Sequence, residues 1–184
     1  MKRTGFRKLT YKEALEKRKA KISRLRASTI AQEPHKHLKV TPKRRKKTDR
    51  QKAEEKIWEL CKAIIRKKYP NVCYTCGAHG LEGSNWHTGH GKPKGALQLR
   101  FKYDLRNLKP QCMRDNKNLG GLQDIFIAKL EREEEGLEFL KEACVKIDGR
   151  WEIRRDIPTM GGTDALIFLN EKIAEYTQIL ESMV

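Results

Sequence analysis

The sequence predicts an α+β fold in which short strands and amphipathic helices surround a small cysteine-bearing module, preceded by a basic N-terminal extension. Three observations support this prediction. Cysteines at positions 73, 76 and 112 have the spacing of a structural metal site. Apolar residues recur at three- and four-residue intervals in several segments, which favours helices. Basic residues are concentrated before residue 53.

The basic extension carries almost all of the net charge. Residues 1–52 contain 20 Lys and Arg against 4 Asp and Glu, whereas the other 132 residues contain 21 against 20. Such a segment lowers its own repulsion by neutralising phosphates and releasing counterions, so nucleic acid is the expected partner. A solvated tail without a specific ligand is the alternative. The tract expected to bind DNA phosphates is Lys43, Arg44, Arg45, Lys46 and Lys47.

Composition argues against membrane and disulfide-rich classes. No apolar run approaches the length of a membrane span, and the first residues lack the apolar stretch of a signal peptide. We therefore expect no membrane partner and a cytoplasmic location. Five cysteines, an odd number arranged around a CxxC pair, fit metal binding in a reducing compartment better than a disulfide framework.

Four segments are expected in chain order. Residues 1–47 form the nucleic-acid-binding arm, in which residues 9–27 have helical apolar spacing. Residues 48–70 form a linking amphipathic helix that Thr48 or Asp49 can cap. Residues 71–145 form the central module. Residues 146–184 form a hairpin and a final helix whose apolar stripe serves the core or a homodimer seam.

A sulfur-rich metal site is expected within the central module. Cys73 and Cys76 lie at a tight turn that can direct two thiolates at one soft cation, and Cys112 provides the return ligand. A redox role for the CxxC pair is the weaker interpretation, because that role requires a βαβ context that is absent here. A structural Zn²⁺ is therefore the expected ion.

A second group of potential ligands is rich in nitrogen and oxygen. His87 and His90 lie between the two parts of the cysteine set, and asparagines follow at 107, 116 and 118. Imidazole and amide groups suit a hydrolytic divalent ion. Residues 85–90 are predicted to form a strand, so the two histidines face opposite sides unless Gly89 re-aims the second.

The ordered motifs of residues 73–130 resemble those of the NinG (Rap) recombination endonucleases of phage lambda, a branch of the HNH or ββα-metal nucleases. The shared motifs are CxxCG, WHxxGH, LRFxxxxRNLxxQC and NxxLxG. The resemblance implies a ββα-metal core on a treble-clef zinc knuckle. It further implies a phage-encoded, metal-dependent DNA endonuclease that selects branched recombination intermediates in the host cell.

The resemblance also implies residue roles. His90 is similar to the general base that activates water against the scissile phosphate, and an unperturbed imidazole suits that task near neutrality. Asn107 would hold the loop between the two strands in register. His87 and Asn118 would ligate the catalytic Mg²⁺ or Mn²⁺, with Asn116 as the alternative to Asn118. Helix capping is a competing role for either asparagine.

Two positions depart from the family pattern. Gly89 stands where many HNH proteins carry an acidic metal ligand directly before the base. Asp115 stands where the family has its fourth zinc thiolate. An aspartate can ligate zinc through one oxygen, and His79 offers a competing fourth ligand.

The remaining predictions concern flanking elements. Lys92, Lys94 and Arg100 are expected to contact the DNA backbone. A second strand is expected over residues 97–103, and a long helix, or two helices broken near Gly136, over residues 122–145. The Asp-Gly pair at 148 and 149 predicts a type I′ hairpin over residues 145–153. Thr163 or Asp164 is expected to cap the final helix.

Two other functions are compatible with these patterns. A zinc-dependent DNA-binding or architectural protein would need the cysteines and the arm but not His90. An RNA-binding accessory protein would use the same features, since basic arms and zinc knuckles also suit RNA.

Overall fold

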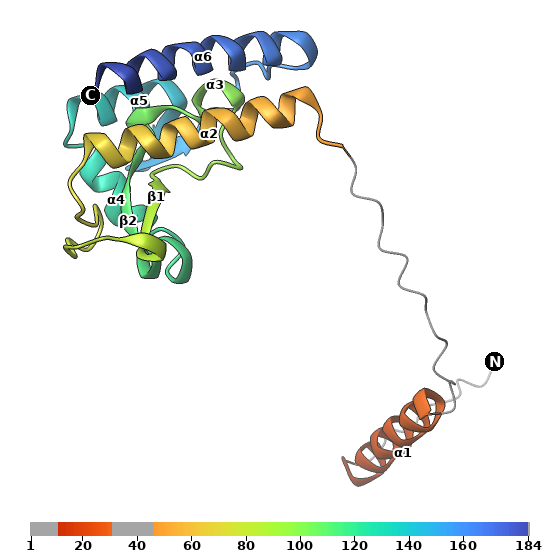
Figure 1. Cartoon of the computed structure of the whole chain (residues 1–184). Coiled ribbons are helices and arrows are strands. Elements are labelled where there is room, and N and C mark those ends of the chain that lie inside the picture. The colour runs from red at the N-terminus through yellow and green to blue at the C-terminus, as the bar shows by residue number, and fades with distance from the viewer. Residues whose placement is uncertain (1–10, 31–45, 184) are drawn as a thin grey trace. The chain divides into compact units, whose positions relative to one another are not determined.

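The computed structural model describes residues 11–30 and 46–183 (Figure 1). The chain divides into two compact units, Met1–Arg45 and Lys46–Val184. In the first unit, α1 spans Tyr11–Ile30, where helical spacing predicted a helix. The basic residues Lys43, Arg44 and Arg45 lie outside the described residues. Within the described ranges, no helix combines the length and apolarity needed to cross a membrane.

The second unit mixes helices with two small antiparallel sheets, which confirms the α+β class. Its helices and strands are α2 (Asp49–Lys68), β1 (Trp86–His90), α3 (Leu99–Lys102), β2 (Leu108–Cys112), α4 (Gln123–Leu130), α5 (Glu134–Ala143), β3 (Cys144–Ile147), β4 (Arg150–Ile153) and α6 (Gly162–Ser182). Three short turns are η1 (Gly83–Asn85), η2 (Leu105–Asn107) and η3 (Arg114–Asn118). Strand β1 pairs with β2, and β3 pairs with β4.

Helix α2 begins and ends where the sequence predicts. Gln51 N donates to Thr48 Oγ1 at 3.2 Å, and Thr48 N donates to Gln51 Oε1 at 2.9 Å, which forms a complete capping box. The helix ends at Lys68, before Tyr69 and Pro70. Its apolar face is buried, and Figure 1 shows α2 lying between α6 and the β1–β2 hairpin.

Two apolar cores hold the second unit together. The first joins α2, the β1–β2 hairpin and α6, and the second joins α3, α4, α5 and the β3–β4 hairpin. In the first core, Ala165, Leu169 and Tyr176 of α6 are buried. The apolar stripe of the final helix therefore packs within the chain. The cysteines Cys61 and Cys144 are also buried, one in each core.

The prediction of a strand over residues 97–103 is wrong. Residues 99–102 form the single helical turn α3. The apolar alternation has another cause, because Leu97 and Phe101 pack in the second core whereas Leu99 and Tyr103 pack in the first. Residues two apart in a helix point in nearly opposite directions, so a helical turn between two cores imitates the period of a strand.

The second strand of the hairpin is β2. All five of its residues are buried, so the polar Lys109 and Gln111, which alternate with Leu108, Pro110 and Cys112, do not mark a solvent-exposed face. Pro110 also argues against a strand, but a two-stranded ribbon has only edge strands, where proline is tolerated.

The region after β2 differs from its prediction in one detail. The helical segment is divided, but the break lies at residues 131–133 rather than at Gly136. Gly136 is in the first turn of α5, where a Cβ atom would lie 2.5 Å from the Leu130 carbonyl oxygen. Glycine therefore allows α5 to approach the end of α4, rather than ending a helix.

The β3–β4 hairpin has the predicted turn. Asp148 and Gly149 both have positive φ angles, 47° and 78°, as a type I′ turn requires. The start of α6 differs from the prediction, because the helix begins at Gly162 after Gly161 rather than at a Thr163 or Asp164 cap.

Candidate functional site

Four predicted zinc ligands come together at one end of the β1–β2 hairpin. The ligand atoms of Cys73, Cys76, Cys112 and Asp115 all lie within 4.8 Å of one another. The first two come from the turn after α2, the third ends β2, and the fourth lies in η3. The competing ligand His79 is exposed and does not belong to this group.

The separations of these atoms fit a tetrahedral zinc ion. The Sγ atoms of Cys76 and Cys112 are 3.9 Å apart, close to the ~3.8 Å that tetrahedral Zn–S bonds of about 2.3 Å produce. Cys73 Sγ lies 3.5 Å from Asp115 Oδ2. Three thiolates and one carboxylate oxygen form a donor set that zinc accepts.

Hydrogen bonds around the cluster favour negatively charged ligands. Cys112 N donates to Cys73 Sγ at 3.3 Å, and Asp115 N donates to Cys112 Sγ at 3.4 Å. Burial tends to raise the pKa of Cys73, but hydrogen bonds from Thr75 and from backbone amides lower it overall. The pKa of Cys112 is raised by burial and by the neighbouring Cys73. Adjacent thiolates repel one another, so they do not all ionise easily without a partner. A bound cation would offset this repulsion.

Two residues that sequence reasoning missed orient the aspartate ligand. Thr75 Oγ1 donates to Asp115 Oδ2 at 2.7 Å, and Gln111 Nε2 donates to Thr75 Oγ1 at 3.2 Å. Burial opposes ionisation of Asp115, but hydrogen bonds from Thr75, Cys76, Arg114 and Cys73 hold its pKa well below the usual range. A Thr between two cysteine ligands gave no recognisable signal, and Gln111 is distant in sequence from the turn that it supports.

Gln111 also explains the absence of an acid before His90. A Cβ atom on Gly89 would lie 1.9 Å from Gln111 Oε1, so the Gln111 side chain fills the space that any residue larger than glycine would need. Gln111 Nε2 is held in that position by a second bond to Gly121 O at 2.9 Å. The departure from the HNH pattern at position 89 is therefore coupled to the packing of β2.

His90 lies at the end of β1 in a partly buried position against α2. Its ring stacks on Trp58, with centroids 5.1 Å apart and an interplanar angle of 21°. The buried Nε2 atom has no hydrogen-bond partner among the described residues. Burial, with a smaller contribution from the cation of Lys94, lowers the pKa of His90 to about 4. The imidazole is consequently neutral and unprotonated at neutral pH.

Lys94 lies beside this histidine in an aromatic setting. Its Nζ atom is 4.5 Å from the Trp58 ring centroid and 4.8 Å from that of Tyr103. Both separations suit cation–π contacts. Burial lowers the pKa of Lys94, and Lys102 adds to the effect. The two basic groups, Lys94 and neutral His90, thus share the Trp58 ring.

Asn107 is fully buried and fixes the loop that follows His90. Lys92 N donates to Asn107 Oδ1 at 2.7 Å, and Asn107 Nδ2 donates to Lys92 O at 3.0 Å. Gly91 N donates to the Asn107 carbonyl oxygen at 3.0 Å. These three bonds join the loop after β1 to the residue before β2, which is the arrangement expected for Asn107.

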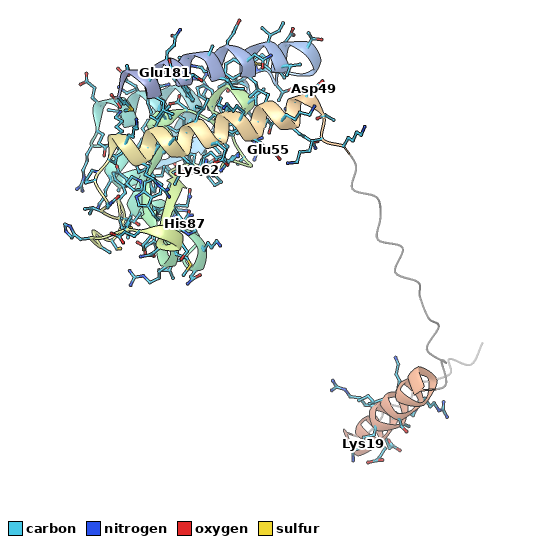
Figure 2. The ribbon with its side chains drawn as sticks, viewed as in Figure 1. Lys19, Asp49, Glu55, Lys62, His87 and Glu181 are labelled. Carbon is cyan, nitrogen blue, oxygen red and sulfur yellow. The ribbon has the colours of Figure 1, made fainter. Side chains whose placement is uncertain are left out.

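His87 lies in β1 (Figure 2), three residues before His90 in a strand of regular register, so the two side chains leave the strand on opposite faces. Its Nδ1 atom is 3.0 Å from Asn116 Nδ2, and its Nε2 atom is 2.9 Å from Ser84 O. Asn118, expected beside His87, is exposed, and its neighbour Asn116 makes the contact instead. The described residues therefore do not assemble a second ion site beside His90.

The predicted DNA-binding residues have different surroundings. Lys46 and Lys47 are exposed, and Lys47 Nζ pairs with Glu55 at 2.7 Å. Arg100 is exposed on α3. Lys92 is partly buried, and its Nζ atom donates to the Trp151 carbonyl oxygen.

Comparisons of the chain with protein-family models, curated proteins and solved structures gave no match. Inference about function therefore rests on the residues and geometry described above.

Proposed function

We propose that this protein is a metal-dependent DNA endonuclease of the ββα-metal type, similar to the NinG nucleases and selective for branched DNA. The observation that carries the proposal is the sequence of elements around His90. A strand ends at a neutral histidine, a loop pinned by Asn107 follows, and a second strand leads through the metal-ligand group into α4. This order of elements, in which the short α3 lies between the two strands, supports assignment to the ββα type.

Two features of His90 support the role of general base, namely its uncharged state at neutral pH and its fixed ring plane. A base must be unprotonated before it can accept a proton from water, and burial keeps this imidazole neutral. Stacking on Trp58 holds the ring plane, so the orientation of the nitrogen atoms is fixed in advance. His90 would accept a proton from water as that water attacks the scissile phosphate.

Cationic residues beside His90 would place the phosphate. Lys94 shares the Trp58 ring with His90, and Lys92 lies two residues after it in the loop. Both would attract phosphate oxygens without reading base sequence. The exposed basic residues before α2 would add affinity for the DNA backbone.

The catalytic ion is proposed to bind together with the substrate. When bound, Mg²⁺ or Mn²⁺ would act as a Lewis acid on the phosphoryl oxygens. Such ions commonly complete their coordination with substrate phosphates, so an incomplete ligand set in the free protein is compatible with this role. His87 and Asn118, with Asn116 as the alternative, are the ligands that the resemblance implies. In the free protein both His87 nitrogens are occupied by Asn116 and Ser84, so ligation by His87 would require these bonds to break when the ion and the substrate bind.

The low pKa of His90 predicts an unusual pH dependence of cleavage. A base with an unperturbed pKa near 6.5 would be half protonated at that pH, whereas a pKa of about 4 leaves His90 unprotonated throughout the range from pH 5 to 8. We therefore expect the single-turnover cleavage rate to stay nearly constant from about pH 8 to about pH 5.5 and to fall only as the pH approaches 4. The measurement is a pH–rate profile on end-labelled branched DNA with Mn²⁺.

Two controls accompany this profile. A reaction without added divalent ion reports any contaminating metal-independent nuclease, and DNA binding at each pH excludes loss of substrate affinity. A rate that halves near pH 6.5 while binding is constant would show that the catalytic base is not the buried His90.

A non-catalytic, zinc-dependent DNA-binding protein is the second candidate. It is favoured by the packing at Gly89, where Gln111 fills the space of the acidic ligand found in many HNH proteins. In that case the metal-ligand group, formed by Cys73, Cys76, Cys112 and Asp115, would stabilise a DNA-binding surface. His90 would serve only in packing against α2.

A further inference from the structure

A cavity of about 600 Å³ lies between the loop that follows His90 and strand β4. The loop contributes Lys92, Pro93 and Ala96 to its wall, and residues 151–155 come from β4 and the segment that follows it. Its volume is within the range of small-ligand sites in proteins. Because Asn107 fixes the loop, this wall of the cavity is held at a set position relative to His90.

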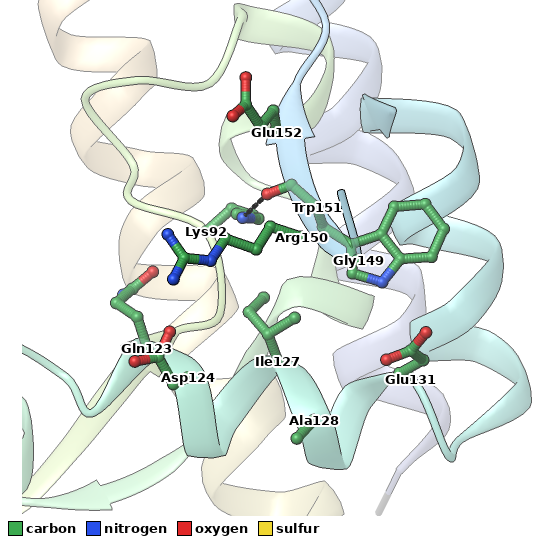
Figure 3. A pocket seen from close by; sticks show the side chains of 10 residues that line it. All are labelled: Lys92, Gln123, Asp124, Ile127, Ala128, Glu131, Gly149, Arg150, Trp151 and Glu152. Atoms are coloured by element: carbon green, nitrogen blue, oxygen red, sulfur yellow. Dashed lines mark hydrogen bonds between the residues drawn. The ribbon is translucent and has the colours of Figure 1, made fainter. Parts of the chain in front are cut away.

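The charge of this cavity differs from that of its neighbour. Both cavities are lined by Lys92, Trp151 and Glu152. The neighbour adds Asp124 and Glu131, and Figure 3 shows Arg150 within it, on the side of Asp124. Its three carboxylates against two cations disfavour a phosphate group.

Arginines make the first cavity suitable for an anion. Arg154 and Arg155 both line it, and Glu152 is its single carboxylate. Arg154 is paired with Asp156 at 2.8 Å. Arg155 is exposed and takes part in none of the ion pairs found among the described residues. With Lys92 at the opposite wall, Arg155 can contact a phosphodiester group.

One polar atom of a residue that lines the cavity has an unmet hydrogen-bonding capacity. Gln98 Nε2 donates to the Ile157 carbonyl oxygen, which fixes the orientation of the amide. Gln98 Oε1 is buried and accepts no hydrogen bond from the described residues. A ligand that donates an N–H group to this oxygen would satisfy it. Pro93, Ala96 and Ile153 provide apolar surface beside it.

We infer that this cavity binds one unpaired nucleotide of a DNA strand. The base would lie against the apolar wall and donate an amino or imino N–H to Gln98 Oε1, while Arg155 and Lys92 contact the adjoining phosphates. The inference rests on the proposed function for its choice of DNA as the partner. It adds the class of substrate, because a base in an intact duplex cannot enter a cavity without leaving its stack.

A binding experiment with the full-length protein tests this inference. The probes are a labelled duplex with a single-stranded tail and a blunt duplex of equal length, at one fixed salt concentration and without added Mg²⁺ or Mn²⁺. We expect Arg155→Ala and Ala96→Trp each to weaken binding of the tailed duplex by roughly fivefold or more and to leave blunt duplex binding nearly unchanged. The first removes a phosphate contact, and the second fills the cavity from an exposed position.

Arg150→Ala is the matched control. Arg150 is an exposed arginine at the start of β4, five residues before Arg155, but it does not line this cavity. Its replacement should affect both probes equally. Equal weakening of both probes by Arg155→Ala and Ala96→Trp, or no weakening by either, would overturn the inference. Tighter binding of an RNA tail with the same dependence on Arg155 would overturn the choice of DNA.

The experiment is independent of catalysis. If the protein binds the tailed duplex more tightly than the blunt duplex, and this preference requires Arg155, nucleotide binding in the cavity is supported even when the protein cuts no DNA. That result would contradict the nuclease proposal. If the protein cuts DNA but binds both duplexes equally well, the nuclease proposal is supported and nucleotide binding in the cavity is contradicted.

Discussion

Replacement of His90 by alanine is expected to lower the single-turnover rate of DNA cleavage by roughly 10²–10⁴-fold, the usual contribution of a positioned general base. The expectation follows from the neutral state of the imidazole and from its fixed orientation against Trp58. DNA affinity should be unchanged, because a neutral side chain contributes little to phosphate binding. Rates measured with saturating protein separate the chemical step from binding.

Loss of packing against Trp58 requires a control for folding. His90→Gln retains most of the side-chain volume and polarity, and it should be as inactive as His90→Ala if proton transfer is what is lost. His79→Ala removes an exposed histidine outside both sites and should cut at the wild-type rate. A folded His90→Ala protein with the wild-type rate would assign this residue to packing alone.

Replacement of Cys112 by serine is expected to lower the free energy of unfolding by roughly 3 kcal/mol or more, with loss of bound zinc. Cys112 is at once a ligand of the metal group and a buried residue of the first core. Removal of one of the four ligands weakens binding of the ion. The turn at residues 73–76 is then held by fewer bonds to β2. Denaturant unfolding and the zinc content of the purified protein measure the two effects.

Cys144→Ser provides the matched comparison. It makes the same chemical change at another buried cysteine, but Cys144 lies in the second core and outside the metal-ligand group. We expect a smaller loss of stability and an unchanged zinc content. A chelator should reproduce the Cys112→Ser effect in the wild type and add little in that variant. Equal stability losses for the two serine variants, with zinc retained in both, would show that the cysteines act only through burial.

Local signals in the sequence predicted much of the secondary structure. The capping box at Thr48 and the Asp-Gly turn at 148 depend on neighbouring residues only, so both could be recognised without a structure. The strand β2 was not recognised, because Pro110 lies at its centre and because its two polar residues, Lys109 and Gln111, are buried by tertiary packing rather than exposed. The turn α3 was mistaken for a strand because its alternate residues enter two different cores, which is a property of tertiary packing.

In the candidate site, the metal-binding residues could be predicted from the sequence, but the residues that support them could not. Cysteine spacing located the metal ligands, and Asp115 joined them as the fourth. The supporting residues Thr75 and Gln111 have no signature, since their roles depend on how β2 packs against the turn. The stacking of Trp58 on His90 likewise joins α2 to β1, two elements that do not adjoin in the chain. The exchange of Asn118 for Asn116 at His87 depends on the π-helical turn of η3, which shifts side chains relative to an α-helix.

Cleavage of end-labelled branched DNA by the purified full-length protein tests the central proposal most directly. Parallel reactions would contain Mg²⁺, Mn²⁺ or no added divalent ion, with linear duplex as the second substrate and binding measured in the same samples. We expect discrete products from the branched substrate when Mg²⁺ or Mn²⁺ is present and no products without an added ion. Intact DNA under every condition, although the protein binds it, would contradict the nuclease proposal and leave a zinc-dependent DNA-binding protein as the better description.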